Sequence, residues 1–340
     1  MTEHASDISA LSLDAIRRNS AALVGDVVRT PCLTLDSGLM ANVLGGGAAV
    51  LKLECFQHTG TFKARGALSV ARGLDAAQRA RGITAASAGN HAIAAAWAAR
   101  QVSASAKVVI QSNANPFRVA MAKAQGAEVI MKAPGAETFA EADRLVRDEG
   151  RYFIHPFEGP LTSLGTAGVG LELMEDAPDL DAVVVSIGGG GLISGIAAAV
   201  KQMNPACQVF GVEPVGAAGM YTSMTKGAPV HLDQVNTVAD SLGAPMSLPL
   251  GHALCAAYVD EIVLLDDDTI CAGMVAFQQE AKLAVEPAAG AAIAAVMGPL
   301  RARLQGKRVG IIVCGANIDA QTYLTLMARG MPAFDALVKS

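Results

Sequence analysis

The chain has 340 residues, of which 52% are hydrophobic and 17% charged, so it can bury a large core and is long enough for two domains. The formal net charge is -5 and no basic run occurs, which argues against a general nucleic-acid-binding protein. Because the sequence offers neither an N-terminal signal-peptide pattern nor an apolar stretch long enough to span a bilayer, we expect a cytoplasmic protein that makes no membrane contact.

Cysteine and histidine spacing argues against a disulfide scaffold or a structural zinc site. The six cysteines are scattered without a C-x-x-C pair, and the six histidines show no ligand spacing. We therefore expect most of the cysteines to be buried thiols.

Strand-like apolar runs alternate with Ala-rich helical segments along nearly the whole chain, a pattern typical of a parallel α/β architecture. Strands are expected at residues 50–54, 106–111, 128–131, 182–187, 208–212 and 308–313. Helices are expected at residues 90–100, 116–125, 136–149, 192–203, 267–282 and 288–304. Since ligands of open α/β sheets gather at the carboxyl ends of the strands, the Gly-rich turns after these strands are the places to look for a site.

The first such turn precedes a lysine. Residues 59–67 read TGTFKARGA, and they place Lys63 in the first turn of an expected helix, directly after a short strand. Free N–H groups between Gln57 and Thr61, together with the helix N-terminus, predict an anion site within reach of the lysine amine. A phosphate and an aldehyde on one ligand indicate pyridoxal phosphate (PLP), bound to Lys63 as a Schiff base. The alternative is that Lys63 and Arg65 are ordinary solvated helix residues.

The second turn is SAGNHA at residues 87–92, after an apolar run. Small residues let a flat ring approach the backbone, and Asn90 offers an amide to a ring hydroxyl. Ser87 or Asn90 could instead only cap the next helix.

The third turn contains four consecutive glycines, Gly188 to Gly191, after an apolar strand and before a helix. Their N–H groups are unobstructed by side chains, which indicates a phosphate cradle. A dinucleotide loop is the alternative, because Glu213 stands near the end of the next strand, where an acidic ribose partner would lie.

The fourth turn is VCGAN at residues 313–317, again after a strand, where Cys314 could face a ring nitrogen. Taken alone, Cys314 would more simply be a buried structural thiol.

In this combination and order, the segments closely resemble those of the fold-type II PLP enzymes, specifically the serine/threonine dehydratase (threonine ammonia-lyase) and serine racemase family, from about Thr30 to Asn317. The resemblance implies an α/β fold like that of the tryptophan synthase β chain, with two domains that are each an open, mostly parallel sheet flanked by helices. Residues 1–52 and 156–340 would form the large PLP-binding domain and residues 53–155 the small domain. It also suggests a homodimer.

The family resemblance also implies roles for individual residues. Lys63 would be the catalytic residue, and the substrate would lie against residues 87–91. The expected cofactor contacts are Phe62, Lys63, Asn90, Gly188, Gly189, Gly190, Gly191, Glu286 and Cys314, and the expected substrate contacts are Ser87, Ala88, Gly89, Asn90 and His91.

The implied activity is β-elimination from a β-hydroxy amino acid such as L-threonine, L-serine, 3-hydroxyaspartate or phenylserine, giving a 2-oxo acid and ammonia in amino-acid catabolism. Lys63, with a pKa depressed by burial and by a cationic imine, would remove the Cα proton. A thiol at the ring nitrogen is a weak proton donor, which favours elimination over transamination.

Two departures from the family pattern bear on function. Racemases that resemble this chain have a serine where Ala88 stands, and an alanine cannot reprotonate the carbanion, so we expect little racemisation. At the family's usual divalent-cation site, Glu213 and Ala217 match but Gly219 replaces an aspartate, so no metal is expected there. A racemase of the same family, and a nucleotide-binding α/β module in which Lys63 is incidental, are the alternatives.

Overall fold

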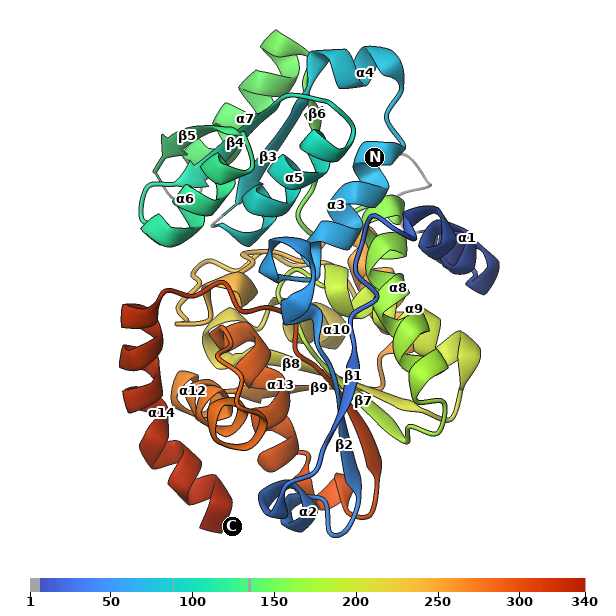
Figure 1. Cartoon of the computed structure of the whole chain (residues 1–340), viewed down its shortest axis with the longest axis vertical. Helices are drawn as coiled ribbons and strands as arrows, with labels where there is room; N and C mark the ends of the chain where they lie inside the picture. Colours follow the sequence, from blue (N-terminus) through green and yellow to red (C-terminus); the bar gives the residue numbers. More distant parts are fainter. Residues whose placement is uncertain (1–6, 88, 134–135, 340) are drawn as a thin grey trace.

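The computed structural model describes residues 7–87, 89–133 and 136–339 and shows two β-sheets, each flanked by helices (Figure 1). Within the described residues, the larger sheet has six strands in the order β1-β2-β10-β7-β8-β9. Only the pair β1–β2 is antiparallel, and the other neighbouring strands are parallel. The strands are β1 (Cys32–Leu35), β2 (Ala48–Lys52), β7 (Ala182–Ser186), β8 (Gln208–Pro214), β9 (Glu261–Leu265) and β10 (Arg308–Ile312).

The smaller sheet is fully parallel, with the order β5-β4-β3-β6 among the residues described. Figure 1 shows it at the top with helices α4 to α7, above the six-stranded sheet. Its strands are β3 (Ile83–Ser87), β4 (Ala106–Gln111), β5 (Glu128–Lys132) and β6 (Tyr152–Phe153). The chain thus begins in one sheet, builds the other, and returns; the domain boundaries expected at residues 52/53 and 155/156 stay a prediction.

Helices cover both sheets. They are α1 (Leu13–Leu23), α2 (Gly38–Val43), α3 (Lys63–Arg72), α4 (Ala76–Arg81), α5 (Asn90–Gln101), α6 (Pro116–Ala124), α7 (Ala136–Glu149), α8 (Pro160–Asp176), α9 (Gly191–Met203), α10 (Gly219–Lys226), α11 (Pro249–Tyr258), α12 (Asp267–Ala276), α13 (Pro287–Met297) and α14 (Ala320–Lys339). Short 3-10 turns are η2 (Ile8–Leu11), η3 (Glu54–Phe56), η4 (His58–Gly60), η5 (Val215–Ala217), η6 (Asp240–Leu242) and η8 (Arg301–Leu304), and η7 (Phe277–Ala281) is a π-helix. Among the described residues, none of these helices has the length and apolar character needed to cross a bilayer.

The central strands are buried on both faces, as a parallel sheet between helices requires. All five residues of β7 are buried, and α9 and α13 are buried over most of their length. This burial explains why these strands and helices are continuous apolar runs in the sequence rather than alternating patterns.

Two expected helices are shorter than the apolar pattern predicts. The helix expected at 267–282 ends at Ala276 and continues as the π-helix η7, and Lys282 then takes a left-handed backbone conformation. The helix expected at 288–304 ends at Met297, because Gly298 leaves the helical region and Pro299 follows it. The strand expected at 50–54 ends at Lys52, and η3 begins two residues later, at Glu54.

Four buried charged side chains meet beneath the N-terminus of α3. Arg65 is 1% exposed and binds Glu54 and Glu172, and Lys52 binds Glu172 from the other side at 2.7 Å. Arg65 donates hydrogen bonds of 2.8 to 3.0 Å to both carboxylates and to the carbonyl oxygen of Val28. Arg65 is therefore not a solvated helix residue; this buried ionic cluster fixes the start of the helix that carries Lys63.

Candidate active site

A cavity of about 460 Å³ is lined by strand ends and loops associated with both sheets, a size usual for a small-molecule site. The structure brings together in its lining nearly every residue that the sequence singled out: Phe62, Lys63, Ser87, Gly89, Asn90, His91, Gly188, Gly189, Gly190, Gly191, Glu286 and Cys314. Ala88, also expected there, lies outside the described residues.

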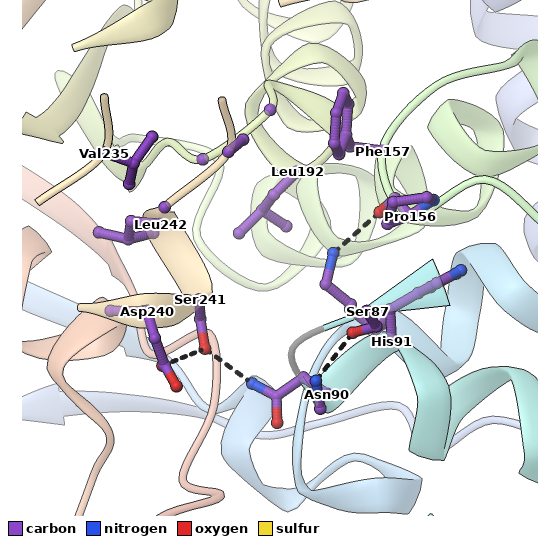
Figure 2. Close-up of a pocket in the computed structure, with 18 of the residues that line it drawn as sticks. Ser87, Asn90, His91, Pro156, Phe157, Leu192, Val235, Asp240, Ser241 and Leu242 are labelled. Atoms are coloured by element: carbon purple, nitrogen blue, oxygen red, sulfur yellow. Dashed lines mark hydrogen bonds between the residues drawn. The ribbon is translucent and has the colours of Figure 1, made fainter. Parts of the chain in front are cut away.

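Lys63 is the first residue of α3, and its amine is a cavity-lining group. The amine donates a 2.9 Å hydrogen bond to the carbonyl oxygen of Pro156, which Figure 2 shows, and lies 4.9 Å from the centre of the Phe62 ring. Burial lowers the pKa of the Lys63 ammonium to about 8, although Cys314 and Glu286 oppose this shift. A sizeable fraction of the amine is thus neutral near physiological pH and can act as a nucleophile or base.

The turn before Lys63 is not the anion site that the sequence predicts. The N–H of Gly60 donates to the carbonyl of Gln57, that of His58 to the Gln57 side chain, and that of Phe62 to the carbonyl of Cys314. Thr59 takes a left-handed conformation with φ of 67°, which costs a non-glycine residue about 1–2 kcal/mol. The Phe62 amide holds the turn against Cys314, just beyond β10, and the other two amides bond within the turn instead of facing a ligand.

The glycine loop has the properties of an anion cradle. The backbone N–H groups of Gly188 to Gly191 find no protein acceptor among the residues described, although Gly189 to Gly191 are buried. Buried, unpaired N–H groups are rare in folded proteins, and those at the start of α9 also lie at a helix N-terminus. A Cβ at Gly189 would overlap the Phe157 ring, so a side chain there is excluded. These residues fit a phosphate group.

Asn90, Glu286 and Cys314 form a buried polar corner of the cavity. The Asn90 amide donates to both carboxylate oxygens of Glu286 at 3.0 and 2.9 Å. It also donates to the Ser241 hydroxyl at 3.1 Å, as Figure 2 shows. The Asn90 oxygen accepts from the Asn317 amide at 2.9 Å. Burial raises the pKa of the Cys314 thiol well above its usual range, so this residue offers a neutral S–H.

Ser87, Gly89 and His91 surround the start of α5. The Ser87 hydroxyl accepts from the Gly89 N–H at 2.9 Å, so it shapes the turn rather than pointing away from it (Figure 2). The His91 ring is 3% exposed, and its Nε2 hydrogen-bonds the carbonyl of Ile154 at 2.8 Å. Burial and the nearby Lys63 lower the pKa of His91 to about 3. His91 is therefore a neutral residue that donates to the backbone.

Apolar side chains face one another across the cavity. Figure 2 shows Val235 and Leu242 on one side, and Phe157 and Leu192 on the other. These residues, with Arg118 and Pro156, were not identified as site residues from sequence. Arg118 lies on α6 and Leu192 follows the glycine loop at the start of α9, and none of the six carries a motif of its own.

Glu213 is not available to a ribose or to a cation. It is 0% exposed, and its two carboxylate oxygens accept the N–H groups of Met220 and Tyr221 at 2.8 and 2.7 Å, at the start of α10. Burial raises the pKa of Glu213 to about 7. Ala217 is buried beside it in η5, and no cluster of three metal-ligating side chains occurs within residues 7–87, 89–133 and 136–339. The residues present do not fit a divalent cation, and the dinucleotide alternative loses its ribose partner.

Known proteins resemble the chain along nearly its whole length. Residues 24–315 match the family model described as "Pyridoxal-phosphate dependent enzyme". The chain is 47% identical to a phenylserine dehydratase of Ralstonia pickettii, over 84% of this chain and 87% of that protein. It is 34% identical to an L-threonine ammonia-lyase of Thermotoga maritima, over 94% and 79% of the two chains. The solved structure of maize serine racemase superposes with a TM-score of 0.87 at 33% identity, over 97% of this chain and 99% of that one.

Proposed function

Since the chain belongs to the pyridoxal-phosphate-dependent enzyme family and its cofactor is PLP, we propose that it is a lyase that converts a β-hydroxy amino acid to a 2-oxo acid and ammonia. The expected fold class and cofactor are confirmed by the family match and by the maize structure. The observation that carries the proposal is the Lys63 amine, with its pKa lowered to about 8, in a cavity whose glycine loop has unpaired N–H groups.

When bound, PLP supplies an electron sink for a substrate Cα that loses its proton. The glycine loop, Gly188 to Gly191, would hold its phosphate, and Phe62 would pack beside its ring. Asn90 would bind a ring hydroxyl, with Glu286 near the ring, while Cys314 would present its neutral thiol to the ring nitrogen.

Lys63 would carry the proton in the reaction. Its neutral amine accepts the Cα proton, and the Pro156 carbonyl, 2.9 Å away, orients the amine. The β-hydroxyl leaves as water with a proton equivalent to the one taken from Cα, the enamine that is released tautomerises to an imine, and addition of water to this imine gives the 2-oxo acid and ammonia. The loop around Ser87, Gly89 and His91 would bind the substrate carboxylate; the family resemblance implies that Ala88 and Asn90 also contact the substrate.

The substrate side chain would lie against apolar walls. Val235, Leu242, Phe157 and Leu192 all line the cavity, which suits an apolar β-substituent better than a charged one. A relative that is 47% identical is a phenylserine dehydratase. We therefore place 3-phenylserine ahead of threonine and serine as the substrate to test.

The deciding experiment incubates the PLP-loaded protein with 3-phenylserine, L-threonine and L-serine in parallel and follows both the 2-oxo acid and ammonia. Lys63→Ala should abolish product and also abolish the borohydride-trapped cofactor adduct, which mass spectrometry locates on the Lys63 peptide. Lys123→Ala, on the exposed face of α6, serves as the matched control. Release of D-serine from L-serine at a rate comparable to pyruvate would instead support the racemase alternative.

Cytoplasmic location and homodimerisation belong to the same proposal. The expectation of a cytoplasmic location rests on the sequence pattern and that of a homodimer on the family resemblance, and the acidic composition fits a protein with no nucleic-acid partner. Light scattering of the purified protein and fractionation of the source cells test these two points.

A further inference from the structure

Arg118 is a buried arginine that connects the two sheets of the molecule. It lies on α6, which packs with the four-stranded sheet, and it is 4% exposed. Its guanidinium reaches three segments associated with the six-stranded sheet. Nε donates to the Asn317 carbonyl at 2.9 Å, Nη1 to Asp240 at 2.5 Å, and Nη2 to Glu286 at 3.3 Å.

Arg118 is the cationic partner of Glu286. Its side chain is 2% exposed, burial raises its pKa, and Arg118 is the chief influence that lowers the pKa again. In the described part of the chain, Glu286 forms an ion pair with no other residue. The other titratable groups that influence it are Lys63, Asp240 and Cys314.

The carboxylate of Glu286 in turn orients Asn90, whose amide nitrogen lies 2.9 Å and 3.0 Å from its two oxygens. Arg118 also packs against the residue that precedes Asn90. Gly89, directly before Asn90, has φ of 151°, and a Cβ there would overlap the aliphatic part of the Arg118 side chain. One side chain therefore contacts the loop that precedes Asn90 and the carboxylate that Asn90 binds.

We propose that Arg118 is a positioning residue of the cofactor site, which holds the Glu286 carboxyl group in place and, through Glu286, holds the Asn90 amide toward the cavity. The inference rests on the cofactor contacts proposed above for Asn90 and Glu286. The guanidinium is suited to this role because its fixed donors reach three acceptors at once, which a lysine ammonium at the same position cannot do with the same geometry.

The test measures the PLP dissociation constant of the apo-protein between pH 6 and 9. Arg118→Met should weaken binding at least tenfold at pH 8 and less at pH 6, because the loss of Arg118 raises the Glu286 pKa and strands a buried charge only above that pKa. Arg118→Lys should recover part of the affinity. Adding Glu286→Gln to Arg118→Met should also recover part of it, because no stranded charge remains. Arg144→Met, which removes a half-buried arginine on α7 that pairs with Glu141, should change binding less than twofold.

Equal PLP affinity of Arg118→Met and wild type would overturn the proposal. A loss of PLP affinity that is independent of pH and is not relieved by Glu286→Gln would also overturn it, since a merely structural role of Arg118 predicts that pattern. If Arg118→Met does not fold, Arg118→Lys and the double variant carry the same comparison. If even the wild type takes up no PLP, the proposed function fails separately. The melting temperatures of the apo-proteins with Arg118→Met, with Glu286→Gln and with both changes, each compared with wild type, then decide whether Arg118 and Glu286 are coupled.

Discussion

Replacing Arg65 by methionine should destabilise the fold strongly, because it leaves the buried Glu54 without a cationic partner and Glu172 with Lys52 alone. Arg65 donates five hydrogen bonds, four of them to Glu54 and Glu172, and all three side chains are at most 6% exposed. With Arg65 removed, Lys52 is the remaining cation of the cluster, and of the two carboxylates it pairs with Glu172. Breaking a buried ion pair from one side costs about 3–5 kcal/mol.

The expected shift in melting temperature follows from the length of the chain. An unfolding entropy of about 2.1 cal/mol/K per residue gives about 0.7 kcal/mol/K for 340 residues, so about 4 kcal/mol lowers the midpoint by about 6 °C. Circular dichroism of the apo-protein at pH 7.5 measures this shift. Arg147→Met, which removes an arginine whose side chain is 70% exposed, should shift the midpoint by less than about 1 °C.

A second variant separates the stranded charge from lost packing. Adding Glu54→Gln to Arg65→Met removes the carboxylate that has lost its cation, so the double variant should melt above the single one. A midpoint for Arg65→Met within 1 °C of wild type, or a double variant that melts lower than the single one, would refute the reasoning that the cluster is held together by charge.

Three further predictions concern the site and its surroundings. The rate of PLP uptake by the apo-protein should rise with pH and level off above about 8, since only the neutral Lys63 amine attacks an aldehyde; a rate that rises steadily to pH 10 would show an ordinary lysine. Gly189→Ala should weaken PLP binding and destabilise the fold by about 1–3 kcal/mol, because the added methyl group overlaps the Phe157 ring. Adding Phe157→Leu should relieve part of both effects, as PLP titrations and melting curves of the two variants would show. Glu213 has a pKa of about 7 when folded, above its unfolded value of about 4.3, so its protonated form stabilises the fold at low pH and this stabilisation is lost as the pH rises through 7. Melting temperatures should accordingly show wild type losing stability relative to Glu213→Gln between pH 4.5 and 7, and EDTA should leave both midpoints unchanged.

The strands of the sheet centres could be predicted from sequence because burial on both faces leaves continuous apolar runs. Residues 106–111 and 182–187 were placed correctly to within one residue for this reason. The edge strand β9 was missed although it contains the apolar run Ile262 to Leu265, and the two-residue strand β6 gives no comparable signal. The π-helix η7 depends on packing that no local pattern records.

The site was predictable where a residue type is itself unusual. Four glycines in a row and a lysine after a small-residue turn stand out in any sequence, and both line the cavity. Arg118 and Pro156 did not stand out, because their importance comes from partners far away in the chain: Arg118 contacts Glu286, and Pro156 contacts Lys63. Such pairings appear only after the two sheets are brought together.

The acceptor of the Lys63 amine is a main-chain carbonyl and not a side chain. Any amino acid at position 156 carries that oxygen, so point mutations cannot delete it; they can only move it by shifting the turn. That turn is tied by His155, whose Nδ1 accepts the N–H groups of Phe157 and Glu158 at 3.3 and 3.0 Å. The apolar walls of the cavity, by contrast, consist of side chains that a point mutation can replace. Over evolutionary time, relatives of this chain can therefore exchange one substrate for another while the lysine keeps its hydrogen-bond partner.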